Sequence, residues 1–196
     1  MIKKIILILI IFGGVSFGVW KYKENQSKFL AYHLKSIGIK IEQAEDFLVT
    51  EISDPKKGSK ARTITAKKDQ EEIKIKIVNN VEKDEALNYI EDKKENFESL
   101  YKLAKNPYPE AMKKQKECPE EYRPEVKKHG YGEYFLTYAG EDLGYGICKE
   151  DLVRYKAVLG YFYCENISSF IKIEYFTSKE KNHEEMNSLI NSFRCE

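Results

Sequence analysis

Hydrophobic and polar residues alternate through much of the first half of the chain. In the stretch 72–78, Ile73, Ile75 and Ile77 fall on one side of an extended backbone, and lysines separate them on the other. A period of two is typical of a strand with one buried face and one solvated face. Alternation or β-branched enrichment predicts earlier strands at residues 37–41, 47–52 and 61–66.

The pattern then changes to that of an amphipathic helix. Asp84 is placed as its N-cap, and an apolar stripe runs from Ala86 through Ile90 to Ala104. Two prolines just beyond the stripe end the helix. The polar and charged residues that follow predict a long surface loop over 110–129.

From residue 131 the chain returns to strand patterns and closes with a second helix. The expected strands cover residues 131–139, 143–148, 152–163 and 169–177. Asn182 followed by Glu185 resembles a capping box. Apolar residues then follow helical spacing at Met186, Leu189, Ile190 and Phe193. This order predicts an α+β fold in which two helices pack on an antiparallel β-sheet.

A hydrophobic segment precedes this domain. Residues 5–20 carry no charge and follow a short basic stretch, which is typical of a signal-anchor or a cleaved secretory signal. Cleavage near Gly18 would release the chain, whereas the aromatic and basic residues 20–23 favour an uncleaved membrane anchor. We therefore expect an anchor or signal at 1–20, a juxtamembrane stalk or short helix at 21–36, and an extracytoplasmic domain at 37–196.

Charge excludes one class of partner. The chain has 33 Lys+Arg and 32 Asp+Glu, and only Lys3 and Lys4 lie in the first twenty residues. The remainder therefore carries 31 basic and 32 acidic residues, with the two signs interspersed. Such a surface provides no basic field for a phosphate backbone, so we expect no nucleic-acid partner.

Four cysteines lie in the last eighty residues and favour disulfides in an oxidising compartment. None belongs to a C-x-x-C pair or has a histidine at a metal-ligand spacing. If residues 143–148 form a strand, the alternation of hairpin ends brings Cys118 near Cys148 and Cys164 near Cys195. That pairing is one of the three that four cysteines allow.

Motifs for catalysis, cofactors or metals are missing from the sequence. No nucleophile elbow or phosphate-binding loop occurs. We expect the isolated histidines 33, 129 and 183 to lie at the surface. The acid pairs at 141–142 and 150–151 are interpreted as turn residues rather than as a Ca²⁺ site. The sequence thus predicts no catalytic, cofactor-binding or metal-binding residue.

Tyrosine is the most unusual feature of the composition. Nine of the fourteen tyrosines lie between residues 122 and 175. Most are expected in the core, because tyrosine suits a sheet that is covered on both faces. Tyr131 and Tyr145 each stand between two glycines, and we take them as interaction candidates, since exposed tyrosine is favoured at interfaces. By strand alternation, Tyr131 should share a face with Phe135.

The order of elements resembles that of the PsbP-like α/β-sandwich family of small exported proteins. The matching features are the isoleucine strand 37–41 leading to Phe47, Tyr134 and Tyr138 in a hairpin sheet, and a final helix that ends Leu-Ile-Asn-Ser-Phe at 189–193. Residues 42–46 depart from the family's Pro-x-Gly-Trp turn. The resemblance implies a non-enzymatic binding or assembly role and names no partner.

Three functions follow from these observations. The leading expectation is a single-pass protein with its domain in the periplasm or at the cell surface, which binds a protein partner through a sheet face or the 110–129 loop. The second is a secreted inhibitor or virulence-type factor released near Gly18. The third is a hydrolase or metal enzyme, which would need a pocket that gathers His129 with Glu141 or Asp142.

Overall fold

The computed structural model describes residues 25–55, 60–105, 122, 124–141, 152–178 and 183–196. The hydrophobic segment 1–20 lies outside these residues, as do Cys118, Cys148 and the expected strand 143–148. Tyr145, Asp142, the acid pair at 150–151 and Asn182 also lie outside them. Among the residues that are described, no helix is both long enough and apolar enough to cross a membrane.

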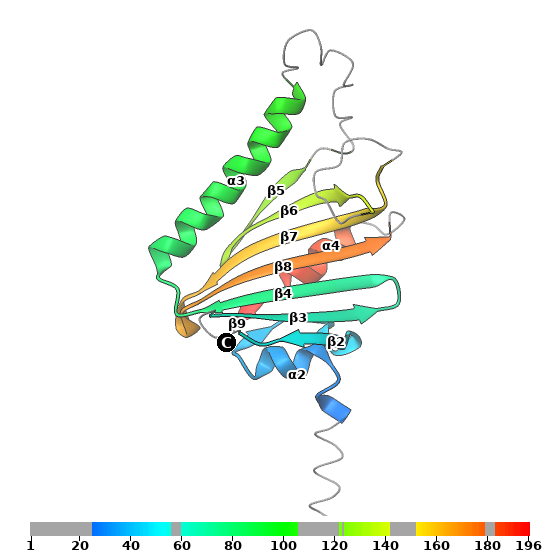
Figure 1. Ribbon diagram of the computed structural model, residues 1–196, viewed down its shortest axis with the longest axis vertical. Helices are drawn as coiled ribbons and strands as arrows, with labels where there is room; N and C mark the ends of the chain where they lie inside the picture. Colours follow the sequence, from blue (N-terminus) through cyan, green and yellow to red (C-terminus); the bar gives the residue numbers. More distant parts are fainter. Residues whose placement is uncertain (1–24, 56–59, 106–121, 123, 142–151, 179–182) are drawn as a thin grey trace, which may run out of the picture.

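A seven-stranded sheet forms the body of the protein, and every neighbouring pair of its strands is antiparallel (Figure 1). In spatial order the strands are β2 (Leu48–Ser53), β3 (Ala61–Lys68), β4 (Glu71–Asn79), β8 (Ser169–Ser178), β7 (Tyr155–Cys164), β6 (Gly132–Ala139) and β5 (Glu125–His129). The connection from β4 crosses to the far edge of the sheet, and the later strands return until β8 pairs with β4. The α+β class and the antiparallel sheet are therefore confirmed.

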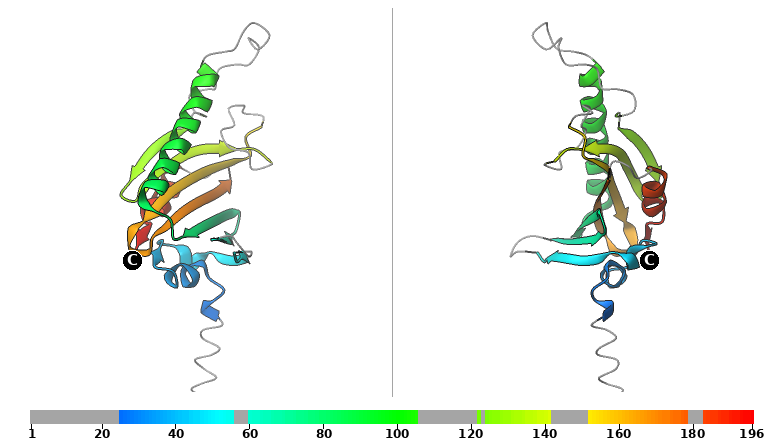
Figure 2. Two further views of the ribbon diagram at one scale, coloured as in Figure 1. Left: turned by 60° about the vertical axis from the view of Figure 1, so that its left-hand side comes forward. Right: turned by 90° about the vertical axis from the view of Figure 1, so that its right-hand side faces the viewer.

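Helices lie on both faces of this sheet (Figure 2). One face, which we call the inner face, is covered by α2 (Leu30–Lys35) and α4 (His183–Asn191). The other, outer face carries the long helix α3 (Lys83–Lys105). Three helices of four residues or more thus appear in the described part of the chain: the two predicted to pack on the sheet, and α2, which lies in the stretch 21–36 where a stalk or short helix was expected.

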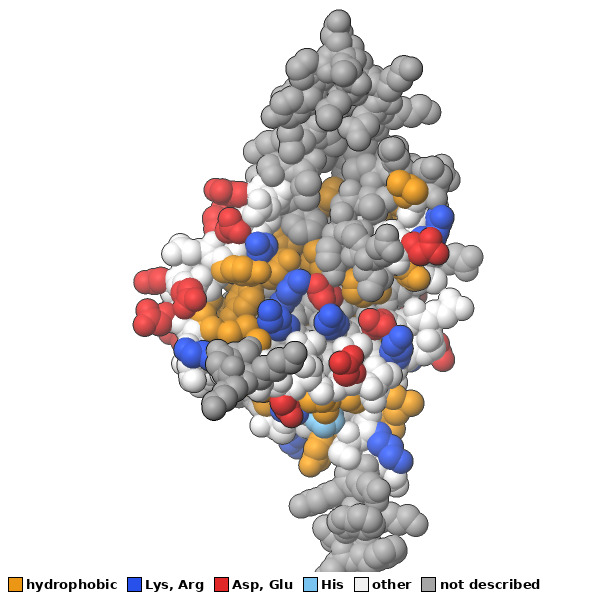
Figure 3. Space-filling model, viewed as in Figure 1, with side chains coloured by type: hydrophobic (Ala, Val, Ile, Leu, Met, Phe, Trp, Pro, Cys, Tyr) orange, Lys and Arg blue, Asp and Glu red, His pale blue; other side chains and the backbone are white. Residues whose placement is uncertain are grey.

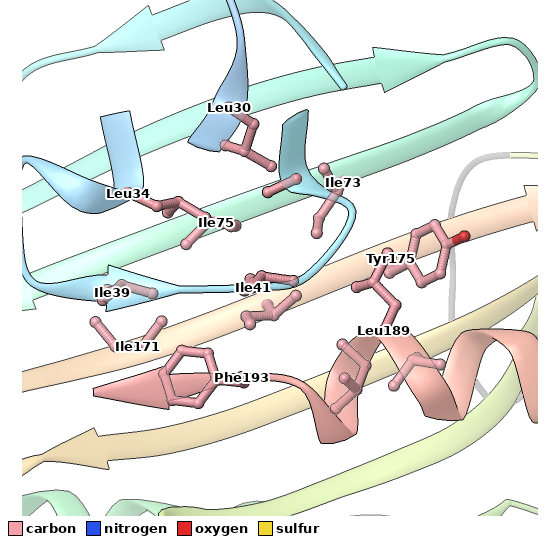
Figure 4. Close-up of a cluster of buried hydrophobic side chains, with 14 of the residues drawn as sticks. Leu30, Leu34, Ile39, Ile41, Ile73, Ile75, Ile171, Tyr175, Leu189 and Phe193 are labelled. Carbon is pink, nitrogen blue, oxygen red and sulfur yellow. The ribbon is translucent and has the colours of Figure 1, made fainter. Parts of the chain in front are cut away.

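The inner core is built from the predicted alternations. Ile73, Ile75 and Ile77 of β4 are at most 1% exposed. Ile171, Ile173 and Tyr175 of β8 point into the same core and meet the buried stripe of α4 (Figure 4). Because these residues occur at every second position, all of their side chains reach one layer between the sheet and the helices.

The short helix α2 belongs to this core. Leu30 and Leu34 are fully buried and pack in the cluster of the inner face (Figure 4). Backbone bonds from Leu30 N to the Phe47 carbonyl and from Val49 N to the Lys28 carbonyl fasten the segment to the start of β2. The folded body therefore begins before residue 37, and α2 is part of it rather than a linker in front of it.

A second, two-stranded sheet closes the C-terminus. β1 (Ile39–Lys40) pairs with β9 (Arg194–Cys195), so that Ile39 lies opposite Cys195. The strand expected at 37–41 is therefore much shorter in the structure. Gly38 has φ +74° and accepts a hydrogen bond from Glu196 N at 2.9 Å, and this left-handed turn stops the alternation before Ile39.

Two local predictions were wrong. Residues 125–129 form the edge strand β5 rather than loop, because they pair along their length with β6 through a tight turn at Gly130. An edge strand exposes one backbone edge to water and tolerates charged side chains, so its sequence looks like loop. Asp84 lies in the first turn of α3, which begins at Lys83, and is not its N-cap.

Candidate functional site

Tyr131, one of the two interaction candidates, lies in the turn between β5 and β6. Its ring is half-buried and stands edge-on to Phe193, with 5.7 Å between ring centroids. Its carbonyl accepts a hydrogen bond from Tyr163 N at 2.8 Å. Tyr131 thus packs against the inner core, whereas Phe135 packs on the outer face. The prediction that the two share a face was wrong, because the alternation of β6 starts only at Gly132.

A hollow of about 510 Å³ opens beside this ring. We call it the Tyr131 hollow. Its wall contains Leu87, Gly130, Tyr131, Tyr163 and Cys195. Leu87 is 46% exposed, so the hollow offers apolar surface to the solvent.

A disulfide fixes the base of the hollow. Cys164 at the end of β7 is bonded to Cys195 of β9, with 5.6 Å between their Cα atoms. The predicted pairing of these two cysteines is confirmed. Close by, Lys83 Nζ lies 3.0 Å from a carboxylate oxygen of Glu165, which links the start of α3 to the turn after β7. The disulfide joins β7 to β9 covalently at this corner, and the ion pair is solvent-exposed and adds little to that link.

His129 contradicts the expectation of a surface histidine. Its half-buried ring packs against Phe162 and Phe193, with centroid separations of 5.2 and 6.0 Å. Burial lowers the pKa of this imidazole, a hydrogen bond with the Asn191 backbone raises it, and the positive charge of Arg194 lowers it further. Nδ1 accepts a hydrogen bond from Tyr131 N at 3.3 Å, so the neutral ring carries its proton on Nε2.

The other histidines are also half-buried. Nε2 of His33 lies 2.8 Å from the Ser27 carbonyl oxygen. His183 begins α4, and its pKa is lowered mainly by burial and also by the charge of Lys156. His129 and Glu141 lie at opposite ends of β6, so the structure does not bring them together. In the described ranges no three His, Cys, Asp or Glu side chains converge as metal ligands would.

The tyrosine-rich region mainly fills the core, as predicted. Five of its described tyrosines are buried: Tyr122, Tyr134, Tyr161, Tyr163 and Tyr175. Tyr134 donates its hydroxyl hydrogen to Asn191 at 3.1 Å, and Tyr163 donates to the Val81 carbonyl at 3.2 Å. These bonds satisfy the polar end of each ring while the body packs among apolar side chains.

A second concave surface was not predicted. A groove of about 480 Å³ runs between α3 and the outer face of β4 and β8, and we call it the α3 groove. Figure 3 shows its apolar floor as an orange area with lysines on one side and acids on the other. The floor and wall consist of Val78, Val81, Ala86, Tyr89 and Phe170.

Tyr89 forms the aromatic wall of the α3 groove. It is 41% exposed and meets the Phe170 ring edge-on, with 5.0 Å between centroids. Lys93 Nζ lies 4.6 Å from the centre of the same ring. Tyr89 lies one position before Ile90 on α3 and outside the predicted stripe. Only the way in which the helix crosses the sheet makes it part of a groove.

Charged residues border the groove on both sides. On the sheet side, Lys76 of β4 lies directly opposite Lys172 of β8. On the helix side, Asp92 forms an ion pair with Lys93 at 3.2 Å, and Glu85 stands two turns earlier on α3. The alternation in 72–78 predicted that Lys76 points away from the isoleucine face, which is confirmed, but it did not predict that Lys76 faces Lys172.

No family model, curated protein or solved structure matches this chain.

Proposed function

We propose that this chain is a membrane-tethered binding or assembly protein without enzymatic activity, whose folded body lies outside the cytoplasm. The observation that carries the proposal is the Cys164–Cys195 disulfide, because such bonds persist in oxidising compartments. The uncharged segment 5–20 supports attachment to a membrane, and the basic and aromatic residues after it support an interfacial position.

Its partner is a protein that contacts the Tyr131 hollow. Tyr131 brings a half-buried aromatic ring there, and the exposed side chain of Leu87 adds aliphatic surface. Interfaces concentrate their binding energy in such aromatic anchors. The disulfide beside them holds the surface in one conformation, so little entropy is lost on binding. Tyr145 stays a candidate for the same role.

The PsbP-like sandwich is also part of this proposal. An antiparallel sheet with helices on both faces and the final amphipathic helix α4 support it. A shared fold does not specify a ligand, so this resemblance adds no partner.

Location is tested on material from the native membrane. We expect intact mass to include residues 1–20, and a non-reducing peptide map to contain Cys164 linked to Cys195 and Cys118 linked to Cys148. A reporter enzyme that works only outside the cytoplasm should be active when it is fused to the C-terminus. A mass that corresponds to a chain beginning after Gly18 would show that the protein is secreted rather than tethered. Four free thiols, or a cytoplasmic C-terminus, would contradict the proposed location.

The partner surface is tested by mild cross-linking in the same membranes. A protein that co-purifies with the wild type should be lost with Tyr131→Ala. Tyr32→Ala is the matched control, because Tyr32 is 43% exposed on α2 and does not line the hollow. The same set of captured proteins from both variants would remove Tyr131 from the interface.

A further inference from the structure

The α3 groove has the size and lining of a small-molecule site. Ligand pockets commonly enclose about 300–1,000 Å³ and have mainly apolar walls with a few charged or polar groups. The groove falls within that range, and Phe170, Val78 and Ala86 form an apolar floor that ends at the Tyr89 ring. Phe170 is only 8% exposed and belongs to the core of the outer face, whereas Tyr89 is 41% exposed and can pack on a ligand.

Two cations meet at one side of this floor. Lys76 and Lys172 are paired in register across β4 and β8. Residues so paired have Cβ atoms about 4.5–5.5 Å apart, and like charges at that position repel each other. Lys172 also contacts Glu174, which offsets part of its charge. Within the described ranges Lys76 forms no ion pair, so its ammonium group is free to bind an anion.

The acids on the helix side do not reverse this preference. Asp92 is already bonded to Lys93, and Lys93 adds a positive charge over the Tyr89 ring. Glu85 lies in the first turns of α3, on the wall opposite the two lysines. Positive charge therefore collects at the sheet side of the groove, next to its apolar floor.

We infer that the α3 groove binds a small organic anion whose aromatic or aliphatic body lies on Phe170 and Tyr89 and whose carboxylate is held by Lys76 and Lys172. An anion placed between the two ammonium groups removes their repulsion and gains charge-assisted hydrogen bonds. The apolar body gains burial on the floor of the groove. This site is separate from the Tyr131 hollow and does not depend on the proposed protein partner.

Three probes of one shape test the inference. Phenylbutyrate, phenylbutylamine and phenylbutanol each carry a phenyl ring on a four-carbon chain and differ in the charge at its end. Each is titrated against the full chain in nanodiscs of zwitterionic phosphatidylcholine, and binding is followed by saturation-transfer NMR with empty nanodiscs subtracted. We expect phenylbutyrate to bind about tenfold more tightly than either other probe, because a hydrogen bond to a charged group contributes roughly that factor.

Matched variants locate the site. Lys76→Gln should weaken phenylbutyrate about tenfold and leave phenylbutanol unchanged. Lys74→Gln is its control, because Lys74 lies on the same face of β4 and does not line the groove. Tyr89→Ala should weaken all three probes, with Tyr32→Ala as control. Equal affinities for the three probes, equal effects of Lys74→Gln and Lys76→Gln, or no saturable binding would overturn the inference.

Discussion

Gly132 lies against the backbone of the neighbouring strand at Tyr161. A Cβ atom added at Gly132 would stand 2.1 Å from the Tyr161 carbonyl oxygen, closer than atoms in a folded protein approach. The contact is with backbone, so no side-chain rotation relieves it. Glycine at this position therefore lets β6 begin close to β7, directly after Tyr131.

Substitutions at the two glycines around Tyr131 should have opposite effects. Gly132→Ala forces β6 and β7 apart and should lower the free energy of unfolding by about 2 kcal/mol or more. Gly130 has open space around the position of a Cβ atom, so Gly130→Ala should be neutral or add up to about 1 kcal/mol. Urea denaturation measures both. Equal losses would show that the turn as a whole, and not the close approach, requires glycine.

The disulfide should contribute strongly to stability. It joins residues separated by 31 positions, and closing such a loop in the unfolded chain is worth about 3–4 kcal/mol. Cys195→Ala should lose that amount in urea denaturation and leave Cys164 as a small buried thiol. Reductant breaks the same bond in the wild type, so the free energies of unfolding of the two proteins should then be equal. Equal stability without reductant would contradict this role.

Regular alternation made most of the sheet predictable. Ile73, Ile75 and Ile77 indicated both the strand and its buried face, since a period of two leaves no other arrangement with one apolar side. The edge strand β5 gave no such signal, because its lysines and glutamate remain solvated on an edge. The six-residue helix α2 has only Leu30 and Leu34 as a stripe, and its burial depends on tertiary contacts with residues 47–49 and with the inner core, which no local pattern contains.

The candidate sites were less predictable, because each combines distant segments. The pairing of Cys164 with Cys195 was predicted from the alternation of strand ends in hairpins, on the condition that residues 143–148 form a strand, and that stretch lies outside the described residues. The α3 groove depends on the angle at which α3 crosses β4 and β8. The sequence pattern around Tyr89 does not predict that angle. Tyr131 was selected because a glycine stands on each side of it. Its contact with Phe193 depends on how the residues after α4 pack, which the sequence around Tyr131 does not show.

The place of α2 in the core can be tested within one helix. Leu34 is fully buried, and Leu34→Ala should lower the free energy of unfolding by about 2–5 kcal/mol through lost burial and the cavity that remains. Tyr32→Ala, on the exposed side of the same helix, should change it by no more than about 0.5 kcal/mol. Urea denaturation monitored by circular dichroism compares them. An unchanged free energy of unfolding for Leu34→Ala would mean that α2 is a linker and not part of the core.

The environment of His129 should make stability depend on pH. Its pKa is lowered in the folded state by burial, so in the unfolded state the ring takes up a proton at a higher pH. Above a pH of about 6.5 the ring is neutral in both states and has no effect. As the pH falls below that value, the unfolded state binds the proton first and the free energy of unfolding decreases, until the folded pKa is passed.

NMR titration of the His129 ring and urea denaturation at several pH values measure the two sides of this linkage. The midpoint of the titration should lie below 6.5. His129→Phe keeps an aromatic ring among Phe162, Phe193 and Tyr131 but cannot bind a proton, so its stability should decline less steeply with acid. The remaining slope includes His183, whose pKa burial also lowers. Identical slopes for variant and wild type would mean that His129 titrates alike in both states and that its packing does not exclude the charged ring.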